Sequence, residues 1–190
     1  MKPFHGIMID PPWPERGGGK IKRGADRHYT VIKKREDILE VILAADQWNP
    51  AEDCHLYLWS TNNYLPWALW LIKELGFRYI TNFPWTKTGA AGLGQYARGK
   101  HELLLFGVRG QGFKACTVHP ETGKRVKNID TARLVQVHRV RDPDTGKVVH
   151  SAKPPEARQL VEDRTIGPYL EMFARGQAPK GWTFWGDQAL

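Results

Sequence analysis

Strand-like and helix-like apolar patterns alternate along most of the chain, and this alternation restricts the folds it can adopt. The predicted strands are 6–9, 55–60, 77–85, 101–108, 169–174 and 182–185, and the predicted helices are 34–48, 63–75 and 154–164. Pro66 falls in the first turn of the second helix and Gly76 ends it. Strands that alternate with helices favour an α/β fold, with a mostly parallel sheet and helices on both faces. One domain over residues 1–190 is expected.

Composition narrows the class of protein further. A chain of 190 residues with 41% hydrophobic residues fits one globular domain. The sequence contains no run of roughly 18 apolar residues and no signal peptide, so a cytoplasmic protein without membrane contact is expected. Cys54 and Cys116 are far apart, and the seven histidines lack paired spacing. Neither a disulfide framework nor a metal site is therefore predicted.

The net charge of +8 is concentrated in two segments. Residues 15–35 carry eight bases and two acids, in a glycine-rich loop, and residues 114–153 carry nine bases and four acids. Basic segments on a mildly acidic body favour nucleic acid as a partner, because contacts with phosphates supply most non-specific affinity. Lys20, Lys22 and Arg23 are the candidate contacts in the first segment. The alternative is that both segments are solvated loops.

The second basic segment interrupts the alternation of strands and helices. Residues 119–126 and 142–149 are similar to each other, and each contains a turn sequence, Pro-Glu-Thr-Gly or Pro-Asp-Thr-Gly, among β-branched residues. Such turns predict hairpins. We therefore expect a basic, hairpin-like insertion at about 112–149.

The first predicted strand ends in Asp10, which is followed by Pro11, Pro12 and Trp13. Two prolines make a stiff loop, so the carboxylate and the Pro11 carbonyl become fixed acceptors beside an aromatic ring. Two acceptors suit the amino group of a nucleobase, whose lone pair is delocalised until its N–H bonds are pulled toward tetrahedral geometry. Trp13 would then stack on the base or line its pocket. The alternative is a loop stiffened by prolines, with Trp13 plugging the core.

These four residues resemble the signature of the MT-A70-like adenine-N6 methyltransferases, which transfer a methyl group from S-adenosylmethionine to adenine in DNA or RNA. Four further matches follow in the family's order: Tyr29; Trp85 to Lys87 with the glycines at 89, 92 and 94, Arg98 to Lys100 and the strand 103–107; His150 to Pro154; and Leu170 to Arg175 with Gly181, Trp182 and Gly186 to Gln188. The resemblance covers nearly the whole chain except the insertion. With its basic arms, the compact chain resembles the prokaryotic and phage branch, which mostly modifies DNA.

The resemblance implies a Rossmann-like, class I methyltransferase fold with a permuted order of motifs, in which the catalytic segment precedes the cofactor segment. The implied catalytic residues are Asp10, Pro11, Pro12 and Trp13. The implied S-adenosylmethionine contacts are Asp10, Lys153, Phe173, Arg175, Asp187 and Gln188. The candidate substrate contacts are Tyr29, Lys87 and Arg98, together with Lys20, Lys22 and Arg23.

The function that follows is methyl transfer to the N6 amino group of adenine in nucleic acid. DNA is preferred, because a compact chain with basic arms resembles the prokaryotic and phage branch. Two alternatives stay open: an RNA adenine-N6 methyltransferase, and a non-catalytic scaffold subunit that binds nucleic acid. A homodimer or a partner subunit is also left open.

Overall fold

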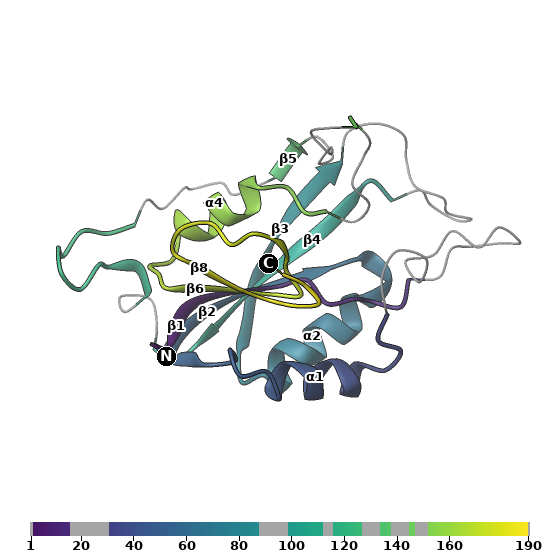
Figure 1. Ribbon diagram of the computed structural model, residues 1–190, viewed down its shortest axis with the longest axis horizontal. Coiled ribbons are helices and arrows are strands. Elements are labelled where there is room, and N and C mark those ends of the chain that lie inside the picture. Colours follow the sequence, from purple (N-terminus) through teal and green to yellow (C-terminus); the bar gives the residue numbers. More distant parts are fainter. Residues whose placement is uncertain are drawn as a thin grey trace, which may run out of the picture.

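A seven-stranded sheet forms the centre of the protein, with the strand order β5-β3-β4-β2-β1-β6-β8 (Figure 1). The computed structural model describes residues 2–15, 31–87, 99–111, 116–126, 134–137, 145–146 and 152–189. The strands of the sheet are β1 (Phe4–Ile9), β2 (Pro50–Ser60), β3 (Arg78–Lys87), β4 (His101–Arg109), β5 (Leu134–Val137), β6 (Tyr169–Met172) and β8 (Trp182–Trp185). The helices are α1 (Arg35–Leu43), the short 3-10 helix η2 (Asn62–Tyr64), α2 (Leu65–Glu74) and α4 (Glu156–Glu162).

The sheet is mostly parallel, as predicted. Strand β1 runs parallel to β2 and β6, β6 runs parallel to β8, and β3 runs parallel to β5. Strand β4 runs antiparallel to both β2 and β3. A parallel neighbour requires a crossover, usually a helix, whereas β4 follows β3 without one and returns beside it. Its first residues therefore lie at the same edge of the sheet as the last residues of β1 and β2.

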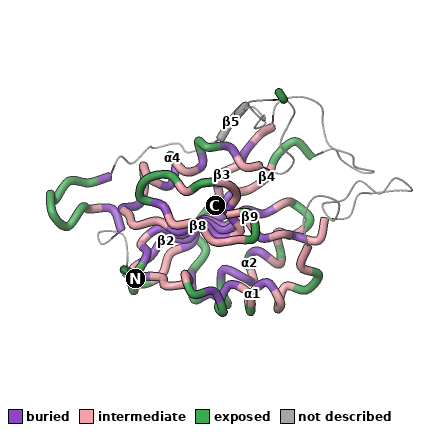
Figure 2. The backbone as a smooth tube through the Cα atoms, viewed as in Figure 1, coloured by how far each residue is buried: buried purple, intermediate pink, exposed green. Residues whose placement is uncertain are grey.

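Both faces of the sheet are covered, and side chains alternate between two cores. Ile7 and Ile9 of β1 pack in the core that contains the buried faces of α1 and α2. Met8, between them, packs with Ala157 and Val161 of α4 in the second core. Figure 1 shows α4 on the face of the sheet opposite α1 and α2, and Figure 2 shows the buried strands between these layers. This Rossmann-like arrangement confirms the predicted fold class.

The ends of the elements differ most from the predicted ends in two places. Helix α1 stops at Leu43 instead of continuing to residue 48, and β2 begins at Pro50 instead of residue 55. Helix α2 has proline in its first turn, as predicted, and Gly76 follows it with a φ of 81°. That left-handed conformation suits glycine, because it lacks a Cβ atom.

Three short strands were not predicted from the sequence. Strand β5 extends the sheet beside β3, and β7 (Arg175–Gly176) pairs in parallel with β9 (Gln188–Ala189). Strand β5 lies inside the predicted basic insertion, where hairpins were expected, and strands of two residues are too short to show a periodic pattern. None of the described helices is both long and apolar enough to cross a membrane.

The first of the two predicted hairpin turns falls within the described residues. Val118 and Arg125 form an antiparallel bridge, and the Gly123 N–H donates to the His119 carbonyl at 2.8 Å. These contacts close a tight hairpin over the Pro-Glu-Thr-Gly sequence. Nearly all of the second turn, at 142–149, lies outside the described residues.

Candidate active site

A cavity of about 470 Å³ lies beyond the carboxyl ends of β1, β6 and β8. It is lined by most of the residues predicted as catalytic or cofactor contacts: Asp10, Pro11, Pro12, Phe173, Arg175, Asp187 and Gln188. Its apolar wall includes Ile32, Val41 and Trp185. Segments from the two ends of the chain thus meet around one cavity.

The position of this cavity follows from the topology of the sheet. From β1 the chain passes through α1 to β2 on one side, whereas β6, on the other side of β1, is reached through α4 on the opposite face. Strand order reverses between β1 and β6. In open α/β sheets, ligands bind beyond the carboxyl ends of the strands at such a reversal. The cavity is therefore the candidate active site.

Asp10 is held firmly at the edge of this cavity. Its N–H donates to the Met172 carbonyl of β6 at 3.3 Å, and its Oδ2 accepts a hydrogen bond from Lys153 Nζ at 2.8 Å. Burial raises the pKa of Asp10 above its ordinary value, and the charges of Lys153 and Arg175 oppose that rise. A carboxylate has about four acceptor positions, so Asp10 can still accept bonds from a ligand.

Lys153 joins two carboxylates in an ion-pair chain, which we define as Lys87–Glu102–Lys153–Asp10. Its ammonium lies 3.5 Å from Glu102 Oε2, and Lys87 binds the other oxygen of Glu102. Burial raises the pKa of Glu102, but the two ammonium groups outweigh burial, so the pKa lies below its ordinary value. Lys153 Nζ also lies 5.5 Å from the centre of the Trp59 ring.

The ion-pair chain changes how two predicted residues are understood. Lys153 does not line the cavity; its ammonium binds Asp10, which does. Lys87, predicted as a substrate contact, binds Glu102 and lies 4.9 Å from the centre of the Trp85 ring. Both lysines therefore form ion pairs with carboxylates: Lys153 with Asp10 and Glu102, and Lys87 with Glu102.

The position of Trp13 differs from the expectation that its ring faces the target base. Trp13 is only 4% exposed, its Nε1 donates to the Trp59 carbonyl at 3.1 Å, and its ring stacks on Tyr64 with ring centres 5.7 Å apart. The indole does not line the cavity. It lies in the core, as the alternative interpretation had it, because its large apolar body is buried while its N–H has a backbone partner. Trp13 thus anchors the loop of Asp10 rather than facing a base.

We expect Trp13→Phe to lower the free energy of unfolding by about 2 kcal/mol, because the Trp59 carbonyl loses its buried donor. Turnover should change only severalfold, since Asp10 keeps its own contacts. Urea unfolding and steady-state kinetics on the same preparation measure both effects. Unchanged stability with a large loss of turnover would instead assign the ring to substrate binding.

The loop after Asp10 is tied to its surroundings by backbone groups. The Pro11 carbonyl accepts the Trp13 N–H at 2.8 Å, and the Pro12 carbonyl accepts the Ile32 N–H at 3.1 Å. A carbonyl oxygen has two lone pairs, so Pro11 retains acceptor capacity. Tyr64 adds a bond from its hydroxyl to the Pro14 carbonyl at 2.6 Å. The loop therefore holds its acceptors in place, as its prolines predict.

The wall of the cavity opposite Asp10 depends on a close approach between two backbone segments, at Gly186 and Phe173. Gly186 has a φ of 151°, and a Cβ atom there would lie 2.9 Å from the Phe173 Cα. Phe173 itself has a φ of 58°, and its ring meets Trp185 edge to face at 5.4 Å. Arg175 and Gln188 are register partners in the β7–β9 pair. The glycine thus lets the two polar segments of the wall lie side by side.

Several predicted contacts lie outside the described residues: Tyr29, Arg98, Lys20, Lys22 and Arg23. Sequence reasoning missed Glu102, whose only local signal is a carboxylate at an inward-facing position of a strand. Trp59 was missed as well, and its buried Nε1 has no hydrogen-bond partner among the described residues. No cluster of three or more metal-ligating side chains occurs in that part of the chain.

Comparison with known proteins places this site in a family. The model of the MT-A70 family matches residues 4–188. The chain belongs to the MT-A70 family. It is 30% identical over 209 aligned positions to the human N(6)-adenine-specific methyltransferase METTL4, covering all of this chain and 38% of that protein. It is also 30% identical over 199 positions to the N6-methyladenosine RNA methyltransferase MTA1 of Cryphonectria parasitica, covering 98% of this chain and 52% of that protein.

The mouse METTL4 protein is 27% identical and is matched over 38% of its length. The chain thus spans about two fifths to one half of the length of these MT-A70 relatives. The match covers both the Asp10 loop and the wall from Phe173 to Gln188.

Proposed function

We propose that this MT-A70 chain transfers a methyl group from S-adenosylmethionine to the N6 amino group of adenine in nucleic acid. The observation that carries the proposal is the pairing of two fixed acceptors, Asp10 and the Pro11 carbonyl, with a ligand-sized cavity at the reversal point of the sheet. The names of the relatives, which specify adenine-N6 methyl transfer, support it.

The cavity fits the cofactor in size and in chemistry. Its volume of about 470 Å³ lies within the usual range for sites of small ligands. Arg175 suits a carboxylate, Asp187 and Gln188 suit ribose hydroxyls, and the rings of Phe173 and Trp185 suit the flat adenine. When bound, S-adenosylmethionine supplies an activated methyl group.

The residues of this chain provide electrostatic and geometric assistance. Asp10 and the Pro11 carbonyl accept hydrogen bonds from the two N–H groups of the target amine. These bonds make the lone pair of the amine more available and stabilise the positive charge that develops on it. Lys153 lowers the pKa of Asp10, which favours the ionised form, against the larger effect of burial. Glu102 and Lys87 hold that ammonium in position. No metal and no covalent intermediate on the protein are needed.

Gly186→Ala should weaken S-adenosylmethionine binding about tenfold, because the new Cβ would push the Asp187–Gln188 segment away from Phe173. Isothermal calorimetry measures this change. Gly123→Ala is the matched control, since its φ is also positive, at 64°, but nothing lies within 4 Å of the added atom. Equal cofactor affinity in both variants would contradict a role for the close approach.

We propose DNA as the substrate, on the resemblance to the prokaryotic and phage branch. RNA is the second candidate, and the name of the fungal relative, an RNA methyltransferase, favours it. A non-catalytic scaffold is disfavoured, because Asp10 and its supporting lysine are both in place beside the cavity. The proposed partner is nucleic acid in each of these cases.

The test is methyl transfer from labelled S-adenosylmethionine to matched DNA and RNA, each single- and double-stranded, with identification of the product nucleoside. N6-methyladenine in one polymer supports the reaction and selects the substrate. Cofactor binding by calorimetry separates the enzyme from the scaffold. Nucleic-acid binding without any cofactor binding or label would favour the scaffold.

A further inference from the structure

Helix α4 follows Lys153 almost directly, so the contacts of this helix bear on the candidate active site. Lys153 stands before Pro154 and Pro155, whose rings fix their φ angles. The Ala157 N–H donates to the Pro154 carbonyl at 3.0 Å, so the first turn of the helix is built on these prolines. Because this connection is short and stiff, the position of Lys153 follows the position of α4.

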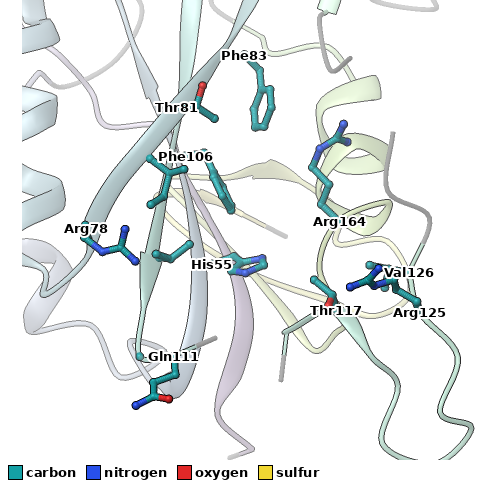
Figure 3. Close-up of a pocket in the computed structure, with 13 residues that line it drawn as sticks. His55, Arg78, Thr81, Phe83, Phe106, Gln111, Thr117, Arg125, Val126 and Arg164 are labelled. Carbon is teal, nitrogen blue, oxygen red and sulfur yellow. The ribbon is translucent and has the colours of Figure 1, made fainter. Parts of the chain in front are cut away.

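Apolar packing holds α4 against the sheet, but it does not fix where along the sheet the helix lies. The helix has seven residues and buries Ala157, Leu160 and Val161 in the core that contains Met8. Burial of apolar surface stabilises without direction. The chain just beyond the helix borders a second cavity, of about 400 Å³, which Arg164 lines (Figure 3). Packing alone therefore leaves α4 room to shift, and directional contacts fix its position.

Directional contacts join α4 to the strands beneath it. Arg158, in the first turn, binds Glu171 of β6 with two hydrogen bonds, from Nε to Oε2 at 2.6 Å and from Nη2 to Oε1 at 3.1 Å. At the other end of the helix, Glu162 accepts a bond from Trp182 Nε1 at 2.8 Å. A guanidinium that binds both oxygens of a carboxylate fixes direction as well as distance. The Arg158–Glu171 pair, which is nearer to Lys153 in the sequence, is therefore the contact that can set its position.

Glu171 lies on the same face of the sheet as Asp10 and close to it. Met8 is the register partner of Glu171, and side chains two residues apart along an extended chain point to the same face. Glu171 is 7% exposed. Burial raises the pKa of Glu171, Arg158 opposes that rise, and the charges of Asp10 and Lys153 act on it as well. The Arg158–Glu171 pair therefore lies next to the ion-pair chain of the candidate active site.

We propose that Arg158 and Glu171 are positioning residues for the candidate active site: their ion pair fixes α4 against β6 and so keeps the Lys153 ammonium between the two carboxylates that it binds. Lys153 Nζ lies 2.8 Å from Asp10 Oδ2 and 3.5 Å from Glu102 Oε2. Attraction between charges falls as their distance grows, so a displacement of α4 weakens both contacts. The bearing of this pair on methyl transfer rests on the proposed function.

The pKa of Asp10 reports where the ammonium lies, and it can be measured without substrate or cofactor. Carbon-13 NMR follows the carboxyl carbon of Asp10 across pH, and the absence of that signal from Asp10→Asn assigns it. Arg158→Lys keeps the positive charge but loses the flat fork that binds both oxygens of Glu171. Arg35→Lys, in an exposed ion pair of α1 on the opposite face of the sheet, is the matched control. Both variants are also made in the Lys153→Met background.

Arg158→Lys should raise the pKa of Asp10, in the direction expected for Lys153→Met but by less, while the control leaves it unchanged. A direct effect of charge would give no shift, because lysine keeps the charge of arginine. Glu102 and Arg175, which also act on Asp10, are the same in every variant. In the Lys153→Met background, Arg158→Lys should have no effect, because the ammonium through which the pair acts is gone.

Three results would overturn the proposal: no shift of the Asp10 pKa in Arg158→Lys, a shift that persists without Lys153, or an equal shift in the Arg35→Lys control. Methyl transfer is measured separately on the same variants. A chain that shows the expected shifts but transfers no methyl group overturns only the proposed function and leaves the positioning of Lys153 in place.

Discussion

Asp10→Asn should reduce methyl transfer by roughly 10²- to 10³-fold, the loss typical of removing one group that stabilises charge in a transition state. Asparagine fills the same space beside the cavity but brings no negative charge to the target amine. Its amide also presents one acceptor oxygen instead of two, so it cannot serve Lys153 and the amine equally well. Single-turnover kinetics with saturating cofactor measures the effect on the chemical step.

Cofactor affinity should change much less than turnover in this variant, because Arg175, Asp187 and Gln188 remain in place. Asp46→Asn, at an exposed turn after α1, is the matched control and should behave as the wild type. Near-normal turnover in Asp10→Asn would contradict the role of the carboxylate and the mechanism built on it.

Lys153→Met should move the acid side of the pH–activity profile to higher pH. The ammonium lowers the pKa of Asp10 against the effect of burial, so its loss raises that pKa and leaves less carboxylate at neutral pH. The same change should lower the free energy of unfolding by about 2 kcal/mol at pH 8, since two largely buried carboxylates lose a partner. Kinetics from pH 5 to 9 and urea unfolding measure both effects.

The stability difference should shrink as the pH falls. Carboxyl groups whose folded-state pKa is raised bind protons more tightly when folded, so the destabilisation is greatest above that raised pKa. It fades as the pH drops through that pKa toward the ordinary values near 4. Lys180→Met, at an exposed position, should show no such pH dependence.

Glu102→Gln should shift the pH–activity profile in the direction opposite to the shift caused by Lys153→Met. Glu102 raises the pKa of Asp10, so its neutralisation should move the acid side of the profile to lower pH while Lys153→Met moves it higher. General damage to the site would move both variants the same way. Parallel shifts in the two variants would therefore contradict an electrostatic role for the ion-pair chain.

The fold and the place of the site were predictable because their signals are local. Residues 6–9 form an apolar run that stops at Asp10 and two prolines, so the strand and the loop after it could be predicted directly. Phe173 and Arg175 follow another such strand. When parallel strands end at one edge, the residues after them meet there whatever their separation in the sequence. The roles of these residues as contacts for cofactor and substrate stay predictions.

The electrostatics of the site could not be predicted, because they depend on pairs that are distant in the sequence. Lys153 binds Asp10 across 143 residues, and nothing near either residue indicates the other. Glu102 reaches the site only because β4 is reversed, which depends on pairing between strands. Trp13 carried two interpretations, since an aromatic ring beside a catalytic loop suits a base and a core equally. The structure buries the Trp13 side chain in the core, so the second interpretation holds.

Contacts between the end of β3 and the start of β4 make the site independent of the length of the segment that connects these two strands. The Lys87 N–H donates to the Lys100 carbonyl at 2.7 Å, and the Lys87 side chain binds Glu102. These contacts close the base of the segment 88–99, and doubling the length of a closed loop costs only about 0.6 kcal/mol. The length of that segment can therefore change at little cost to the folded state, while the contacts of Lys87 and Glu102 beside Asp10 are kept.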